Sequence, residues 1–411
     1  MPAIAYQYSE DIQAVVEGLE RFLRKEVIPR HDDNPQLYED ERDTFTPQGI
    51  YRPEVLAHMR EVRTAASSAG YYNMCAPESI GGQGLGHLAW FAAWERAFRI
   101  CHDKYWLCQF AISHWAFGPS VVLEKMTDKA KAELLPAIVS GEKMMSFGMS
   151  EPGAGSDATM MKTRAVPDGD GWRITGGKIW TTGSPYADYC LIFAITDAEL
   201  AAGRKGGISA FLVPTNSPGF KVERVIKMWG SVGGNEALLY FDNMRVEAHQ
   251  LVGTLNRGFN IAMLGVNLGK LFNAARAVGM SRWALEIAFD YVKIRKAFGH
   301  TLSEYQGVTF PLAESSTDIH AAHLMSINAA HLLDQGIDAR KELSMTKGFA
   351  VKAGARAIDR VMQAHGAIGM TNEMWFTQAY RTLRNVQIAD GANEVLNRTI
   401  VKEMLGGDLE L

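Results

Sequence analysis

The chain lacks the features that mark metal centres, disulfide scaffolds and membrane proteins. Its few cysteines have neither a CxxC pair nor histidines at metal-ligand spacing, so we expect buried free thiols in a reducing, cytoplasmic compartment and no metal site. No apolar run approaches the ~20 residues that span a bilayer, and the first residues lack the cationic and apolar regions of a signal peptide. The cysteines are Cys75, Cys101, Cys108 and Cys190.

The chain also lacks an excess of positive charge. Its 42 Lys and Arg against 46 Asp and Glu give a formal net charge of −4, without the basic stripe that nucleic acid or an anionic membrane requires. It has no strand–GxGxxG–helix unit and no GxxxxGK[ST] loop, so the common nucleotide-binding folds are not indicated. What remains is globular composition, 47% hydrophobic and 21% charged over 411 residues. We expect two or three domains and a small or proteinaceous partner.

The apolar pattern changes twice along the chain. Helical spacing runs to about residue 140, short β-rich pieces with turn residues follow, and long helical patterns return from Gly258 onward. We therefore expect an α+β fold with an N-terminal helical domain at 1–144, a small β-barrel-like middle domain at 145–252 and a C-terminal four-helix bundle at 253–411. The expected strands are 172–175, 176–182, 189–194, 210–213 and 237–241, and the expected bundle helices are 261–294, 303–335, 342–366 and 393–405.

A glycine-rich piece at 151–157 follows a β-like run at 145–150. Its glycines and hydroxyls would let backbone N–H groups approach a flat polar ligand. A plain tight turn explains the same glycines. The neighbouring motifs are needed to choose between the two.

Motifs in register resemble those of the acyl-CoA dehydrogenases from about residue 75 to the C-terminus. The resemblance implies the same helical, β, helical fold, FAD as the cofactor, a CoA thioester as the substrate and electron-transferring flavoprotein as the acceptor. It also implies a homo-oligomer, a dimer or a tetramer. The motifs are the segments 150–157, 177–183, 295–299 with Gln306, and 363–366.

The resemblance implies that one stretch of the middle domain holds the flavin ring. Ser150 would donate to the pyrimidine edge, with Gly155 and Ser156 closing the same loop. Without the neighbouring motifs, Trp180 would be interpreted as a core residue and Ser156 as a turn residue. The residues along or beside the isoalloxazine would be Phe147, Met149, Ser150, Gly155, Ser156, Trp180 and Thr182.

In the family a neighbouring subunit completes the FAD site. Arginine suits the pyrophosphate because its planar donors pair with phosphate oxygens. The alternative for Arg295 is a solvated residue in a basic patch. The corresponding residues here are Arg295, Phe298, Gln306, Gln363 and Gly366.

Asp390 stands where the family usually has its catalytic glutamate. The resemblance implies that Asp390 abstracts the α-proton while hydride passes to flavin N5, and that its backbone N–H donates to the thioester oxygen. Burial should raise the carboxyl pKa and the start of the following helix should lower it, and the sequence does not decide between them. The alternative is an ordinary loop in which Asp390 caps a helix and Gly391 eases the bend.

Aspartate shortens the reach by about one C–C bond, ~1.5 Å, so the site must be rebuilt around it. A second branch of the family has its glutamate where this chain has Gly269 and Lys270, which leaves Asp390 as the candidate. Aspartate at this position resembles cyclohexanecarboxyl-CoA dehydrogenases, Ala-Asp-Gly-type acyl-CoA dehydrogenases and nitroalkane oxidases. Near the base, Ala392 and Glu394 replace a hydroxyl and an amide that contact FAD.

Three residues are predicted to contact the substrate. Lys270 replaces a frequent arginine and would support the charge near Asp390 or the thioester, unless it faces solvent. Asp103 would contact a ring or hydroxyl on an unusual acyl group, and the alternative is a solvated helix residue. Gly391 lies beside the base.

Aromatic residues at 105, 106, 110 and 115 predict a short or compact acyl group, and the alternative is that they belong to the core. The resemblance to cyclohexanecarboxyl-CoA dehydrogenases implies a cyclic or otherwise non-standard group. Two alternative functions stay open: a flavin oxidase of the nitroalkane oxidase type, and a redox-silent homologue that binds CoA thioesters.

Overall fold

The computed structural model describes residues 6–410. The chain forms two compact units, each built from separate segments. The first combines Met1–Ile28, Leu85–Cys108 and Gly269–Leu411, and the second combines Pro29–Gly84 and Gln109–Leu268. Helices come first along the chain, strands follow between Met145 and Val252, and helices return from Gly258. The α+β prediction is confirmed.

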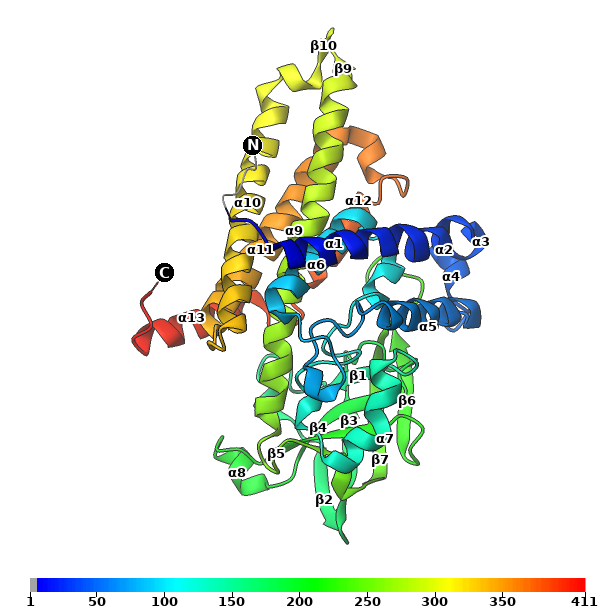
Figure 1. The fold of residues 1–411 in the computed structure, drawn as a ribbon, viewed down its shortest axis with the longest axis vertical. Helices are drawn as coiled ribbons and strands as arrows, with labels where there is room; N and C mark the ends of the chain where they lie inside the picture. The colour runs from blue at the N-terminus through cyan, green and yellow to red at the C-terminus, as the bar shows by residue number, and fades with distance from the viewer. Residues whose placement is uncertain (1–5, 411) are drawn as a thin grey trace. The chain divides into compact units, whose positions relative to one another are not determined.

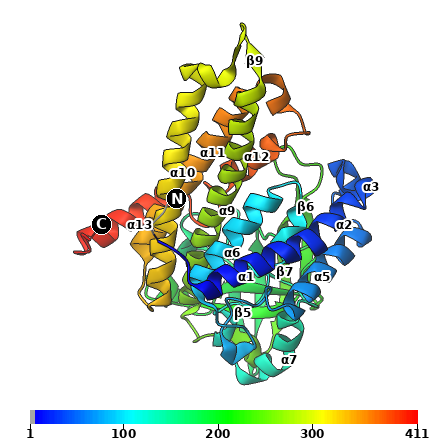
Figure 2. The same ribbon diagram turned by 45° about the horizontal axis from the view of Figure 1, so that its top comes forward.

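The first unit is helical. α10 and α11 lie side by side, and α11 also packs against α12 and α13 (Figures 1 and 2). α9 contributes residues to both units. The helices of the first unit are α1 (Glu10–Phe22), α6 (Gly86–Cys101), α9 (Gly258–Ile294), α10 (Gln306–Asp334), α11 (Arg340–His365), α12 (Phe376–Asn385) and α13 (Asn393–Leu405).

Glycines let the helices of this unit approach closely. A Cβ added to Gly354 of α11 would lie 3.1 Å from both Ser281 Oγ on α9 and Leu383 Cδ1 on α12. A Cβ on Gly279 would lie 2.4 Å from the backbone oxygen of Glu95 on α6. Such distances are below normal van der Waals contact, so any larger residue would push the helices apart.

The second unit is built on an eight-stranded sheet of order β6-β7-β3-β2-β4-β5-β8, with β1 paired to β4. β4 pairs in parallel with β1 and β2, and the other pairs are antiparallel. Helices α5 (Pro53–Ser68) and α7 (Asp128–Val139) belong to the same unit. The strands are β1 (Met145–Gly148), β2 (Arg164–Asp168), β3 (Gly171–Lys178), β4 (Tyr189–Ile195), β5 (Ile208–Pro214), β6 (Phe220–Ile226), β7 (Glu236–Val246) and β8 (Leu251–Val252).

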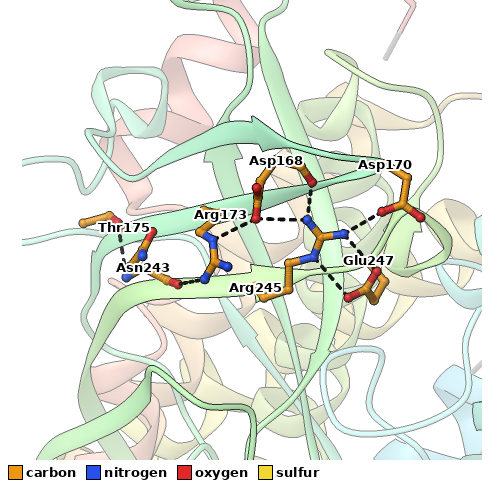
Figure 3. Close-up of polar contacts among 7 residues, drawn as sticks. All are labelled: Asp168, Asp170, Arg173, Thr175, Asn243, Arg245 and Glu247. Atoms are coloured by element: carbon orange, nitrogen blue, oxygen red, sulfur yellow. Dashed lines mark hydrogen bonds and ion pairs between the residues drawn. The ribbon is translucent and has the colours of Figure 1, made fainter.

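Arg245 of β7 fastens the β2–β3 turn (Figure 3). It faces Arg173 of β3 in register, and Asp168 lies between the two, 2.8 Å from Arg173 Nε and 3.1 Å from Arg245 Nη1. Asp170 and Glu247 also pair with Arg245, at 2.6 and 3.1 Å. The carboxylates offset the repulsion of two arginines placed directly opposite each other. Because these groups lie at the surface, either exposed or half-buried, the ion pairs are expected to add little stability.

The differences from the sequence prediction lie at short elements. The expected strands 172–175 and 176–182 form one strand, β3, which ends at Lys178. Strand β6 was not predicted. Four of its seven residues are exposed and the other three are half-buried, so it lacks the buried face that apolar alternation marks. Helix α12 was also not predicted. The four cysteines are free thiols, but Cys75 is only half-buried.

A helix that spans a bilayer needs about 20 predominantly apolar residues. Within residues 6–410, no helix combines the necessary length and apolar character.

Candidate active site

The predicted site residues divide between the two units. The second unit holds the residues predicted to lie along the flavin ring, Phe147, Met149, Ser150, Gly155, Ser156, Trp180 and Thr182. The first unit holds the predicted base with all the others, Asp103, Lys270, Arg295, Phe298, Gln306, Gln363, Gly366, Asp390, Gly391, Ala392 and Glu394.

Asp390 lies in a left-handed turn between α12 and α13. Its φ is 51° and that of Gly391 is 93°. The N-cap of α13 is Ala392, which makes no side-chain cap hydrogen bond. The Oδ2 atom of Asp390 instead accepts a hydrogen bond from Asn273 Nδ2 on α9, at 2.8 Å. The interpretation of Asp390 as a helix cap is therefore wrong.

Burial raises the pKa of the Asp390 carboxyl, and four neighbours oppose this: the charge of Lys347, the Asn273 hydrogen bond and the charges of Arg276 and Lys270. The sequence left open whether burial or the start of the following helix would decide the pKa of Asp390. Because this pKa is raised, burial has the larger effect. A carboxylate with a raised pKa is a stronger proton acceptor when it is ionised.

Lys347 of α11 holds the turn on both sides of Asp390. Its side chain is fully buried, and Nζ donates to the carbonyl oxygens of Ala389 at 2.9 Å and Gly391 at 2.7 Å. Burial lowers the pKa of Lys347 to about 8, while the charge of Asp390 acts in the opposite direction. Lys347 was not predicted from the sequence. Its spacing from the apolar residues Leu343, Ala350 and Gly354 places it on a buried face of α11 and could have identified it.

Lys270, Asn273 and Arg276 follow one another along a face of α9, spaced as i, i+3 and i+6. Lys270 is buried and donates to Ser344 Oγ at 3.2 Å, so the interpretation of a solvent-facing lysine is wrong. Burial, reinforced by the charge of Arg340, lowers the pKa of Lys270 to about 8. Asn273 and Arg276 were not predicted as site residues, although their spacing from Lys270 indicates a shared face of the helix.

Arg276 lies among aromatic rings. Its Cζ atom is 5.0 Å from the ring centroid of Phe98 and 4.5 Å from that of Phe272. Burial lowers the pKa of Arg276, and the charges of Asp103 and Asp390 both act to raise it. Two carboxyl groups therefore affect the pKa of Arg276: that of Asp390, the predicted base, and that of Asp103, a predicted substrate residue.

Asp103 does not lie on a helix. α6 ends at Cys101, and His102 turns the chain with φ of 40°. Burial raises the pKa of Asp103, opposed by Arg276, by a hydrogen bond with Thr382 of α12 and by Arg381. Within residues 6–410 its Oδ2 atom is buried and has no hydrogen-bond partner. The interpretation of Asp103 as a solvated helix residue is therefore wrong.

The His102 ring stacks on Trp283, with ring centroids 4.0 Å apart. Burial, reinforced by the charge of Lys104, lowers the pKa of His102 to about 3. The turn that carries Asp103 is therefore fixed by a neutral, stacked ring.

In the second unit the ends of β1 and β3 are joined. The N–H of Ile179 donates to the backbone oxygen of Ser150 at 2.9 Å. Lys178, fully buried, donates to Glu151 Oε1 at 2.8 Å and to the backbone oxygen of Met149 at 3.2 Å. The two predicted flavin segments are therefore held next to each other.

This surface suits a flat ring with polar edges. Trp180 is 53% exposed with φ of 62°, so its interpretation as a core residue is wrong. A Cβ added to Gly153 or Gly155 would meet nothing within 4 Å. An exposed indole beside an open, glycine-rich backbone fits an isoalloxazine.

The residues predicted to reach a second FAD are accessible. Phe298 has φ of 50° and is 96% exposed. Arg295 directly follows α9, Gln306 opens α10, and both are exposed. Gln363 and Gly366, at the end of α11, are also exposed, whereas Ala392 is half-buried and Glu394 is exposed at the start of α13. These contacts stay a prediction.

Comparison with known proteins gives matches along nearly the whole chain. Family models described as the acyl-CoA dehydrogenase N-terminal, middle and C-terminal domains match residues 9–142, 146–244 and 256–405. An acyl-CoA dehydrogenase of Bacillus subtilis (strain 168) is 33% identical over 338 residues, 82% of this chain and 88% of that protein.

Two further relatives cover similar lengths. The caffeyl-CoA reductase-Etf complex subunit CarC of Acetobacterium woodii is 30% identical over 83% of this chain and 88% of that protein. The butyryl-CoA dehydrogenase structure from Megasphaera elsdenii has a TM-score of 0.82 and 25% identity, covering 98% of this chain and 100% of that one.

Proposed function

Because the chain belongs to the acyl-CoA dehydrogenase family, we propose that it dehydrogenates a compact acyl-CoA thioester with Asp390 as the α-proton base. Acyl-CoA dehydrogenases are FAD-dependent oxidoreductases, so FAD is the cofactor. The observation that carries the proposal is the setting of Asp390. Asp390 is half-buried. Its carboxyl accepts a hydrogen bond from Asn273 and is affected by the charges of Lys347, Arg276 and Lys270, and its pKa is raised.

The proposed reaction removes a proton and a hydride from adjacent carbons of the acyl group. Asp390 would take the α-proton, and the electron pair of that bond would become the new C=C bond. FAD, when bound, would supply the acceptor for the hydride that leaves the β carbon. The surrounding cations favour the ionised form of Asp390 and oppose the effect of burial on its pKa. The backbone N–H of Asp390 is the proposed donor to the thioester oxygen, where negative charge develops.

We assign the flavin ring to the second-unit residues. The ring would be held by Phe147, Met149, Ser150, Gly155, Ser156, Trp180 and Thr182. The hydrogen bond between the Ile179 N–H and the Ser150 oxygen supports this grouping. The FAD of another subunit would be contacted by Arg295, Phe298, Gln306, Gln363 and Gly366. Two further residues would lie near the flavin, Ala392 and Glu394. A homo-oligomer, a dimer or a tetramer, is part of the proposal.

We propose that Asp103 recognises a hydrogen-bond donor on the acyl group, such as a ring hydroxyl. The buried Oδ2 atom without a partner in residues 6–410 supports this role, because a buried carboxylate oxygen gains most from a donor. Lys270 and Gly391 would lie near the thioester end. A cyclic acyl group with a polar substituent is thus favoured.

Electron-transferring flavoprotein is the proposed electron acceptor, which the name of the CarC relative supports. The cytoplasm is the proposed location, and 1–144, 145–252 and 253–411 are the proposed domain limits.

Anaerobic titration of the purified flavoprotein with straight, branched, cyclic and hydroxylated cyclic acyl-CoAs tests the proposal. Bleaching of the flavin by a thioester reports the reductive half-reaction directly. If nitroalkanes bleach the flavin and thioesters do not, and oxygen then reoxidises the flavin rapidly, the protein is an oxidase. Absence of bleaching by every thioester and by nitroalkanes would leave only the redox-silent function.

A further inference from the structure

We infer that Lys347 is a positioning residue that fixes the turn of Asp390 and keeps its carboxylate ionised. This inference rests on the proposed role of Asp390 as the base. Lys347 would act through the turn and through its charge, without touching the substrate.

Lys347 bridges the backbone carbonyl groups of Ala389 and Gly391, and we call this arrangement the clamp. One ammonium group donates to the carbonyl oxygens on either side of Asp390, at 2.9 and 2.7 Å. The enclosed residues, Asp390 and Gly391, both have positive φ. Glycine adopts this conformation freely, but at a non-glycine residue such as Asp390 it is uncommon and is supported by the surroundings. Elsewhere the turn makes backbone bonds from Ile388 to Asn385 and from Asn393 to Gln387. The Lys347 contacts therefore tie the turn to α11.

An aspartate depends on such a clamp more than a longer side chain would. With only two side-chain torsions, the position of its carboxylate follows the position of its Cα. A displacement of the turn is passed on to the reacting oxygen, and a misplacement of about 1 Å costs on the order of a hundredfold in rate.

The charges around this clamp come from several elements. Lys270 and Arg276 approach from α9, Glu394 from α13, and Asp390 lies in the turn itself. Among the cations, Lys347 has the largest effect on the pKa of Asp390, and it lowers that pKa. Removing the Lys347 charge would therefore raise the pKa of Asp390 and move the acidic limb of the activity profile to higher pH.

The same helix offers a matched control. Lys341 of α11 is also buried, at 1% exposure. Its Nζ pairs with Asp408 Oδ1 at 2.5 Å and donates to the backbone oxygen of Glu410. Lys341→Met therefore removes a buried lysine that fastens a different segment.

The test compares FAD-loaded Lys347→Met, Lys347→Gln and Lys341→Met. Hydrogen–deuterium exchange of the amides at 386–392 measures the turn without substrate. Stopped-flow flavin reduction from pH 5 to 9 uses the acyl-CoA that bleaches the wild type fastest. We expect faster exchange, about a hundredfold slower reduction and an acidic limb at higher pH for Lys347→Met, relative to Lys341→Met.

Unchanged exchange, or an acidic limb that stays in place, overturns the inference. If Lys347→Met does not fold, Lys347→Gln, which keeps donors but loses the charge, decides by the position of the acidic limb. Asp390→Asn separates this outcome from the function itself. If Asp390→Asn still reduces the flavin, the proposed base is wrong, whereas an inactive Asp390→Asn with an unaffected Lys347→Met overturns only the role of Lys347.

Discussion

Asn273 of α9 donates to Oδ2 of Asp390 across 2.8 Å, which joins residues 117 positions apart. The bond favours the ionised carboxylate, opposing the burial that raises the pKa of Asp390. Burial therefore raises the pKa of Asp390 and the Asn273 hydrogen bond lowers it. A substitution at residue 273 removes the second effect alone.

Replacing Asn273 by Ala should raise the pKa of Asp390 further, because a hydrogen bond that stabilises the charged form is lost. The acidic limb of flavin reduction should move to higher pH, and the rate near neutrality should fall about five- to tenfold, the equivalent of ~1 kcal/mol. Stopped-flow reduction across pH measures both. Asn328→Ala, at an exposed position of α10, is the control, and an acidic limb shared by both variants would contradict the prediction.

Replacing Asp390 by Asn should remove the proton acceptor while the flavin spectrum stays that of the wild type. We expect flavin reduction to slow by at least about 10²–10⁴-fold, the range of general-base catalysis. Asp390→Glu should also impair turnover, because the pocket is built for the shorter reach. A fully active Glu variant would show that the shorter side chain is incidental.

Asp103→Leu should act on both stability and selectivity. It removes one of the two carboxyl groups that act on the buried Arg276 and leaves only that of Asp390, so urea unfolding should show a loss of about 1–3 kcal/mol. Selectivity for hydroxylated over unsubstituted cyclic acyl-CoA should fall about tenfold or more. Asp290→Asn, exposed on α9, should change neither quantity. Equal selectivity in Asp103→Leu and the wild type would remove Asp103 from the substrate site.

Lys178→Met should weaken flavin binding and stability together. It leaves Glu151 buried without its ammonium partner, and breaking a buried pair costs about 3–5 kcal/mol. FAD content after dialysis and urea unfolding report the two effects. The double variant Lys178→Met/Glu151→Gln should be less destabilised than the single one, and Lys162→Met, an exposed position, serves as the control. A single variant as stable as Lys162→Met would show that the pair contributes little.

Arg295→Ala should lower FAD affinity with little change in the free energy of unfolding, because the side chain is exposed. Loss of a charge-assisted phosphate contact predicts a Kd about tenfold higher or more. Lys293→Ala removes a neighbouring exposed cation of α9 and should leave the Kd unchanged. If both variants bind FAD equally well, Arg295 is a solvated residue.

Features that depend on local sequence could be predicted, and those created by packing could not. The helical and β textures, the glycine-rich loop and the position of Asp390 follow from nearby residues. Lys347 and Asn273 reach the Asp390 turn from α11 and α9, and helical periodicity gives the face of a residue but not what packs against that face. The burial of Asp103 and Lys270 was misjudged for the same reason. A charged residue is usually exposed, and only the tertiary structure supplies the groups that stabilise it.

The left-handed conformation at Asp390 acts as a filter on the residue type that can serve there. Non-glycine residues rarely adopt positive φ, and Asp and Asn do so far more readily than longer side chains. The backbone thus selects against the extra methylene before any chemistry occurs. Asp390→Asn preserves the backbone preference and isolates the carboxylate, whereas Asp390→Glu changes side-chain reach and backbone strain together.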